Sequence, residues 1–202
     1  ARNLGIKNAM GEFICFMDTD DFYISEDVLE HLYYLAKKEN VNICGGCSCN
    51  YKNGKLSFSG LREERRFTEN QYICKEDFPG MTGFWAYIYK KKFLLDNQIF
   101  FPDYIRGQDL VFFAKAISCS GGIFCSSKLV YVYRINHKKV KYDRSKALGI
   151  VNSMKDVLEI AIKNNMKNIQ KIVCDELEGE IGALIYRYSF EGSSEMQSLI
   201  NK

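Results

Sequence analysis

A chain of 202 residues can bury a substantial core as one domain, and a composition of 47% hydrophobic and 26% charged residues excludes a disordered protein. The 28 basic and 25 acidic residues leave a net charge of +3, too even a balance to indicate nucleic-acid binding. Apolar runs are strand-sized and no export signal opens the chain. We therefore expect no transmembrane span and a cytoplasmic protein, with at most peripheral contact to the inner face of the cell membrane.

The first third of the sequence predicts alternating helices and strands. Apolar positions over 4–10 predict a helix with Gly11 as its left-handed C-terminal cap. The apolar run 13–17 (FICFM) is typical of a strand covered on both faces. Ser25 and the two acids after it predict a capped helix start, and a strand is expected over 41–49. This order indicates an α/β fold with a mixed, mostly parallel sheet flanked by helices.

The rest of the sequence predicts further strands and helices, followed by an all-helical segment in its last third. Residues 51–76 have no clear period and are predicted to be loop with a short helix. Further strands and helices are predicted, in chain order, over 84–89, 91–95, 107–118 and 129–135. The last third predicts two helices joined near Asn164 and Asn165, because apolar residues recur at helical spacing. We expect an α/β domain over 1–144 and a C-terminal helical extension over 145–202 packed on it.

An acidic cluster, Asp18, Asp20 and Asp21, follows the apolar strand 13–17 directly. In an open α/β sheet, ligands bind beyond the carboxyl ends of the strands, where these acids fall. Mg²⁺ and Mn²⁺ prefer oxygen ligands and often bridge one or two carboxylates to the phosphates of a substrate. The same residues would also suit a solvated turn that caps the following helix, because Asp favours turns.

Two other metal-dependent classes place acids at this spacing. An EF-hand loop that starts at Asp18 is excluded, because Phe22, Tyr23 and Leu29 occupy the positions of an oxygen ligand, a glycine and a glutamate. A haloacid-dehalogenase-type phosphatase would use Asp18 to form a covalent intermediate. Its signature has Thr or Val where this chain has Phe22, so the phosphatase stays the weaker alternative.

Several segments together resemble the motifs of family 2 glycosyltransferases. The central signature of that family is matched in order and spacing by residues 1–6 (ARNLGI), 11–14 (GEFI) and 16–21 (FMDTDD). Its acceptor-side Glu-Asp motif and the strand after it are matched by 99–102 (IFFP), 107–113 (GQDLVFF) and 131–134 (YVYR). The resemblance covers about residues 1–135, and the joint pattern is far more specific than any one segment.

This resemblance implies a GT-A fold and the inverting transfer of a sugar from a nucleotide diphosphate-sugar, with a UDP-sugar as the first expectation. The acceptor would be a hydroxyl of a glycan or lipid-linked acceptor in bacterial surface polysaccharide synthesis. Asp20 would ligate Mn²⁺ or Mg²⁺ at the diphosphate, and Asp18 would contact the ribose or the metal. Arg2 would contact the nucleotide, and Asp109 would be the general base.

Five further residues have weaker assignments. Trp85 and Gln108 are candidates for acceptor binding, His137 for the metal, and Arg134 and Lys138 for the diphosphate. Packing in the core is the alternative for Trp85, and a solvated loop is the alternative for His137 and Lys138.

Two features depart from the family pattern. Gln108 replaces the acid that is normally paired with the base, which removes a charge from the site. The chain also begins at Ala1 inside a helical pattern, so we expect a preceding segment with the strand and loop that hold the nucleotide. These departures leave a second hypothesis open, a non-catalytic carbohydrate-binding or assembly module of the same fold.

Overall fold

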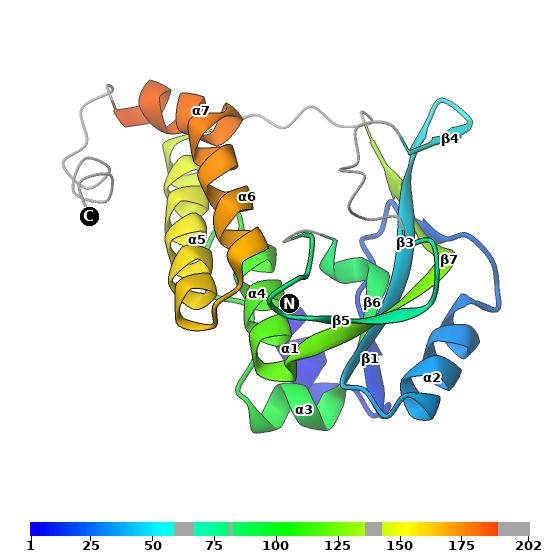
Figure 1. Cartoon of the computed structure of the whole chain (residues 1–202). Helices are drawn as coiled ribbons and strands as arrows, with labels where there is room; N and C mark the ends of the chain where they lie inside the picture. The colour runs from blue at the N-terminus through cyan, green and yellow to red at the C-terminus, as the bar shows by residue number, and fades with distance from the viewer. Residues whose placement is uncertain (59–66, 81–82, 136–142, 190–202) are drawn as a thin grey trace.

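The computed structural model describes residues 1–58, 67–80, 83–135 and 143–189, and these form a mixed sheet with helices on both sides (Figure 1). The strands of the described residues are β1 (Phe13–Cys15), β2 (Phe22–Tyr23), β3 (Ile43–Lys52), β4 (Lys55–Ser57), β5 (Gln71–Cys74), β6 (Tyr87–Lys90) and β7 (Gly122–Arg134). The helices are α1 (Arg2–Asn8), α2 (Val28–Lys38), η2 (Phe84–Ala86), α3 (Lys91–Asp96), α4 (Gln108–Ser120), α5 (Arg144–Lys163), α6 (Lys167–Glu178) and α7 (Glu180–Ser189). The α/β fold class is confirmed.

The sheet has the strand order β1-β6-β3-β7-β2, with β4 paired to β3 and β5 paired to β7. Among the strands that the structure describes, only β3 and β7 pair in parallel, and β6 lies antiparallel between β1 and β3. The strands β1, β3 and β7 therefore run in the same direction, and their carboxyl ends share one edge of the sheet. More of the pairing is antiparallel than the sequence predicted, because β2, β4, β5 and β6 all run opposite to the strands they pair with.

Residues 51–76 were wrongly predicted to lack strands. Lys52 pairs with Lys55, so β3 and β4 form a hairpin whose two-residue turn is Asn53 and Gly54, with φ of 49° and 80°. Such a turn needs positive φ at both positions, which Asn and Gly tolerate. The strand β5 is followed directly by a turn over 75–77 and pairs with the first residues of β7. Both strands are too short to show a period in the sequence.

Helices cover both faces of the sheet (Figure 1). The helix α2 packs on one side, through Val28, Leu32, Leu35 and Ala36. On the other side lies α4, whose apolar residues from Val111 to Ile117 are almost all buried, and α5 and α6 pack outside it. Residues 43–49 of β3 are buried throughout, as expected of a strand covered on both faces.

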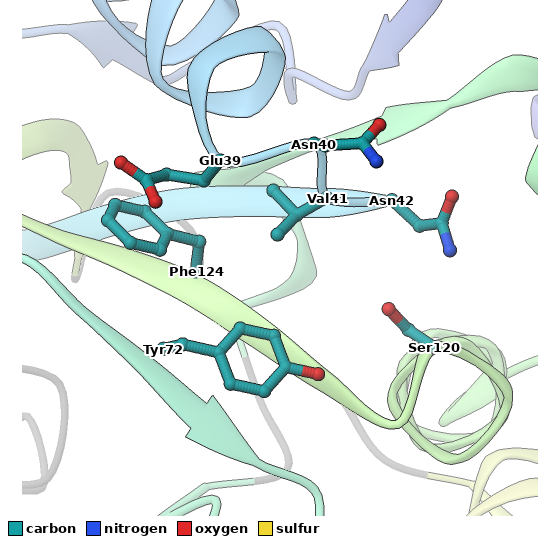
Figure 2. Close-up of a pocket in the computed structure, with 7 residues that line it drawn as sticks. All are labelled: Glu39, Asn40, Val41, Asn42, Tyr72, Ser120 and Phe124. Atoms are coloured by element: carbon teal, nitrogen blue, oxygen red, sulfur yellow. The ribbon is translucent and has the colours of Figure 1, made fainter.

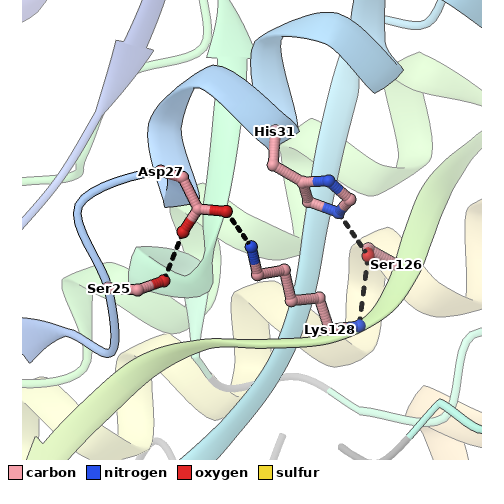
Figure 3. Close-up of polar contacts among 5 residues, drawn as sticks. All are labelled: Ser25, Asp27, His31, Ser126 and Lys128. Atoms are coloured by element: carbon pink, nitrogen blue, oxygen red, sulfur yellow. Dashed lines mark hydrogen bonds and ion pairs between the residues drawn. The ribbon is translucent and has the colours of Figure 1, made fainter.

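A β-bulge interrupts the long pairing of β3 with β7, where Gly46 pairs with Ser126 and Cys47 with Leu129. Side chains stabilise the bulge from two directions. The Cys47 thiol accepts a hydrogen bond from the Phe67 N–H, at 3.1 Å, and donates to the Ser127 carbonyl, at 3.4 Å. The Ser126 hydroxyl lies 2.8 Å from His31 Nε2 on α2 (Figure 3). A bulge shifts the side chains beyond it, so this one determines how the end of β7 meets the functional site.

Two predictions about helix ends and one about the number of helices were wrong. The helix α1 ends at Asn8, and Ala9 is extended, because Lys91 Nζ binds the Ala9 carbonyl and Lys91 N–H binds that of Glu12. Gly11 is therefore no left-handed cap. Ser25 does not cap α2, since its hydroxyl donates to the Asp27 carboxylate at 2.6 Å, a carboxylate that Lys128 also binds (Figure 3). The last third holds three described helices rather than two.

Candidate active site

The acidic run lies where β1 leaves the sheet, and its third member is anchored to β7. Asp21 is 9% exposed and accepts two hydrogen bonds, from the Tyr131 hydroxyl at 2.9 Å and the Arg134 N–H at 2.8 Å. Burial raises the pKa of Asp21, and these two hydrogen bonds oppose that shift. The Tyr131 hydroxyl also accepts a hydrogen bond from the Asp18 N–H at 3.3 Å. Asp21 therefore ties the loop to the sheet and has little capacity left for a ligand.

Arg134 fixes the backbone of the same loop. Its Nε donates to the Asp20 carbonyl at 2.8 Å. The guanidinium lies 5.1 Å from the ring centre of Tyr51 and 5.7 Å from that of Phe22, at distances typical of cation–π contact. Through this contact Arg134 positions the backbone of Asp20. The contact of Arg134 with a diphosphate stays a prediction.

Arg2 reaches the run from α1. Its guanidinium forms an ion pair with Asp18, at 3.0 Å, and both side chains are partly exposed, by 33% and 41%. The same guanidinium lies 5.2 Å and 5.4 Å from the ring centres of Phe84 and Phe101. The structure thus brings together two of the residues that the sequence assigned to the nucleotide. An exposed pair of this kind stabilises the fold little, which leaves both groups available to a polar ligand.

An aromatic stack forms one wall beside the acids. Trp85 is 7% exposed and stacks on Tyr131, with ring centres 4.1 Å apart, and on Tyr133, at 5.5 Å. Burial raises the pKa of both tyrosines, so their hydroxyls stay protonated at neutral pH. Of the three rings, Tyr133 is the most open, at 37% exposed. The role of Trp85 in acceptor binding stays a prediction, and the structure shows it packed behind Tyr133.

Asp109 and Gln108 lie in the first turn of α4. The carboxylate of Asp109 is half-buried and has no hydrogen bond or ion pair with any residue that the structure describes. An aromatic cluster joins this helix to the acidic run, because Phe112 stacks on Phe101 at 4.0 Å and contacts Phe16 at 5.4 Å. Phe101 is the ring on which Arg2 rests. A carboxylate at a helix amino end is favoured in its ionised form, which is the form that accepts a proton.

The turn before α4 is shaped by close packing against α5. Gly107 has φ of 84°, and a Cβ there would lie 2.2 Å from the Ser153 hydroxyl. A Cβ at Gly149 would lie 2.9 Å from the Arg106 carbonyl. The Tyr104 hydroxyl donates to the Asp156 carboxylate at 2.8 Å. The first helix of the C-terminal part thus determines the path of the loop that leads to Asp109.

The remaining carboxylates suit a hard divalent cation. Asp18 and Asp20 are both partly exposed at the strand end, while Asp21 is buried. Within the described ranges no group of three or more His, Cys, Asp and Glu could hold a metal ion by itself. Mg²⁺ and Mn²⁺ commonly bind one or two carboxylates and complete their coordination with substrate phosphates, so two acids at this edge fit such an ion.

His137 and Lys138 lie outside the described residues, so their assignments stay predictions. Two contributors to the site were missed from the sequence, Asp21 as an anchor and Tyr131 as its partner. The alternation of Tyr131 and Tyr133 along one strand could have indicated a shared aromatic face, because alternate residues of a strand point to the same side.

Comparisons with known proteins agree with this geometry. The model of the family described as Glycosyl transferase family 2 matches residues 1–94. The chain is 29% identical over 143 residues to a putative glycosyltransferase, EpsH of Bacillus subtilis (strain 168), covering 67% of this chain and 41% of that protein. It is 31% identical over 115 residues to the uncharacterized glycosyltransferase RC0461 of Rickettsia conorii, covering 54% and 17%. The chain therefore spans less than half the length of either relative.

Solved structures share the fold. The crystal structure of S. aureus TarS 1-349 in complex with UDP-GlcNAc matches with a TM-score of 0.72 at 18% identity, over 98% of this chain and 57% of that one. The complex of the same protein with UDP matches with a TM-score of 0.69 at 19% identity, over 97% and 55%.

A mixed sheet with an acidic run at the carboxyl end of β1 defines the class as the GT-A fold. Residues 1–94 match the model of glycosyltransferase family 2, and the two relatives named above are described as glycosyltransferases. Among the described residues, no helix is both long enough and apolar enough to cross a membrane.

Proposed function

We propose that the protein transfers a sugar, with inversion, from a nucleotide diphosphate-sugar to a hydroxyl of a glycan or lipid-linked acceptor. The observation that supports this most is the meeting of Arg2, Asp18 and Asp20 at one edge of the sheet, where a basic group and two carboxylates can bind a ribose and a diphosphate. A UDP-sugar is the first candidate, because the TarS structures of the same fold hold UDP and UDP-GlcNAc.

In the proposed reaction, the acceptor oxygen attacks the anomeric carbon while Asp109 takes the hydroxyl proton. The bond between the anomeric carbon and the diphosphate oxygen breaks, and the nucleoside diphosphate leaves with that electron pair. Mn²⁺ or Mg²⁺ held by Asp20, with Asp18 beside it, would neutralise charge on the leaving diphosphate. Arg2 would orient the nucleotide through the face of its guanidinium that is not packed on Phe84 and Phe101.

The proposal extends to a wider setting for this activity. We propose bacterial surface polysaccharide synthesis at the cytoplasmic side of the membrane, with residues 1–144 as the transferase domain and 145–202 as a helical extension. The contacts of α5 with Arg106 and Gly107 support an extension that helps to shape the acceptor side.

Asp109→Asn tests the chemical step. With UDP-GlcNAc and a panel of glycan acceptors, the variant should bind UDP as the parent does, while sugar transfer falls at least about 100-fold, the smaller end of the contribution of a general base. Asp103→Asn, an exposed acid in the preceding loop, is the matched control and should transfer at the parent rate. Full transfer by Asp109→Asn would contradict its role as the base. Sugar binding without transfer in the parent protein would instead select the non-catalytic hypothesis.

A further inference from the structure

A groove of about 330 Å³ lies at the opposite edge of the sheet from the acidic run. It is lined by the connection from α2 to β3, by Tyr72 of β5, by Ser120 at the end of α4 and by Phe124 of β7 (Figure 2). The strand β3 begins beside this groove, at Ile43, and ends beside the candidate active site, where Tyr51 contacts Arg134. The groove is therefore separate from the site of the proposed transfer.

One wall of the groove is the turn between α2 and β3, which is fixed by a left-handed residue and a backbone hydrogen bond. Asn40 is left-handed, with φ of 49°, and it ends α2 in the way a glycine commonly does. The Val41 N–H donates to the Ala36 carbonyl at 3.1 Å, which closes the turn and points the following residues into β3. Val41 lies next to Phe124, and the two form the apolar part of the lining (Figure 2).

The opposite wall is the ring of Tyr72, which rests on a glycine backbone. A Cβ at Gly122 would lie 2.7 Å from the ring and from its hydroxyl, so only glycine lets the ring lie in this place. The ring is 49% exposed. Burial raises the pKa of its hydroxyl, which stays a hydrogen-bond donor at neutral pH.

The polar groups of the groove are neutral apart from one acid. The amide of Asn42 and the hydroxyls of Ser120 and Tyr72 surround the same open space (Figure 2), and none has a side-chain hydrogen bond with a residue that the structure describes. Glu39 is the one charged residue of the lining, which contains no Lys or Arg. A phosphate or other anion would meet this carboxylate, and the lining itself supplies no positive charge, since Lys38, which pairs with Glu39 at 3.7 Å, is not part of it.

A sugar ring matches this combination of groups. Its C–H face is apolar and can lie on an exposed aromatic ring, while its hydroxyls both donate and accept hydrogen bonds, as amide and hydroxyl side chains require. The volume falls at the lower end of the range for small-ligand sites, which suits one or two sugar residues.

We propose that this groove binds an uncharged sugar residue of a glycan, at a site distinct from the one where transfer takes place. The proposal extends the proposed function, because a second contact on a glycan acceptor raises its effective concentration at the enzyme. Binding at the groove itself requires neither a nucleotide nor a metal.

The test is a titration with neutral oligosaccharides, followed by the amide NMR spectrum of the protein. The probes are triacetylchitotriose, maltotriose and cellotriose, each up to about 10 mM, since single-site glycan contacts are often millimolar. We expect at least one probe to shift amides of residues 39–42, 72 and 120–124. Tyr72→Ala should weaken that binding about tenfold or more, and Asn42→Ala should weaken it by a smaller factor. Tyr34→Ala, an exposed tyrosine on α2 outside the groove, is the matched control and should bind as the parent does.

Two results would overturn the proposal. One is the absence of any shift at the groove with all three probes, and the other is oligosaccharide binding that Tyr72→Ala and Asn42→Ala leave intact. If Tyr72→Ala does not fold, Asn42→Ala and Tyr72→Phe carry the test. Asp20→Asn separates this proposal from the transferase proposal, because it should weaken nucleotide binding at least about 100-fold and leave oligosaccharide binding at the groove unchanged.

Discussion

The Tyr131 hydroxyl lies 2.9 Å from the Asp21 carboxylate, a contact between residues 110 positions apart in the chain. It joins the end of β7 to the loop after β1, and the Arg134 N–H binds the other oxygen of the same carboxylate. The acidic run therefore divides into two partly exposed acids, Asp18 and Asp20, which we propose meet a ligand, and one buried acid, Asp21, which holds the loop in place.

Replacing this buried acid should lower stability. Asp21→Asn can accept one of the two hydrogen bonds but turns an N–H₂ group toward the other, so we expect a loss of about 1–3 kcal/mol in the free energy of unfolding, measured with urea. Asp103→Asn, an exposed acid, should change it by less than about 0.5 kcal/mol. In the background of Tyr131→Phe, the effect of Asp21→Asn should shrink, because one partner is already absent. Equal losses in both backgrounds would show that the hydrogen bond contributes nothing.

The close approach of α5 to the start of α4 predicts a specific cost at Gly107. Gly107→Ala should be destabilising both through its φ of 84° and through the collision with Ser153. Gly54→Ala isolates the first effect, because Gly54 has φ of 80° and no atom within 4 Å of the added Cβ. We expect a loss of about 1–2 kcal/mol at Gly54 and a clearly larger one at Gly107, measured by urea unfolding.

A double-mutant cycle separates the collision from the strain. Ser153→Gly removes both colliding atoms and should itself cost about 1 kcal/mol in α5. When it is combined with Gly107→Ala, the total loss should be smaller than the sum of the two single losses. Simple additivity would contradict the packing described for this turn.

The hydrogen bond between His31 and Ser126 predicts a pH-dependent stability. The Lys128 N–H donates to the Ser126 hydroxyl at 3.1 Å, so that hydroxyl is free to donate its own proton to a neutral His31 (Figure 3). Burial lowers the pKa of His31 most, and the charge of Lys128 lowers it further. The charge of Asp27 opposes both effects. A histidine with a lowered folded-state pKa contributes stability at neutral pH that is lost as the pH falls below about 6.5, its unfolded value.

Urea unfolding between pH 7.5 and pH 5 would measure this effect, a range that covers the ordinary histidine pKa. The free energy of unfolding should fall toward acid pH in the parent protein, and His31→Gln should flatten that part of the profile. The chain has one other histidine, so His137→Gln is the matched control. The account fails if His137→Gln removes the slope and His31→Gln leaves it.

The eight cysteines divide into two groups that a thiol reagent should distinguish. Cys44, Cys47, Cys49 and Cys125 are buried, and Cys15, Cys74, Cys119 and Cys174 are exposed. Burial raises the pKa of the Cys44 thiol to about 12, so it is almost never a thiolate at neutral pH. We expect the four exposed thiols to react in the native protein and the other four only after unfolding. Fast reaction of all eight would contradict the burial of β3.

Parts of this structure were readable in the sequence because they depend on local patterns. The run FICFM ends abruptly in acids, which correctly placed those acids at the carboxyl end of a strand. The helix at 108–120 and the strand at 87–90 also follow from their apolar residues, although the first three residues of the expected strand form a 3₁₀ turn.

Other parts depend on contacts between distant segments. Ser25 has the local features of a helix cap. Its hydroxyl instead donates to the Asp27 carboxylate, which also forms an ion pair with Lys128 of a distant strand. The buried Asp21 is held by Tyr131 and Arg134, more than 100 residues later in the chain. The need for glycine at position 107 depends on Ser153, 46 residues later. No local periodicity carries such information.

The most direct test of the central claim is calorimetric titration of UDP into the protein with and without MnCl₂. If Asp20 holds the metal at the diphosphate, UDP should bind with Mn²⁺ and weaken at least about 100-fold without it or in Asp20→Asn, while Asp103→Asn binds as the parent does. UDP binding that is indifferent to both Mn²⁺ and Asp20→Asn would contradict the account.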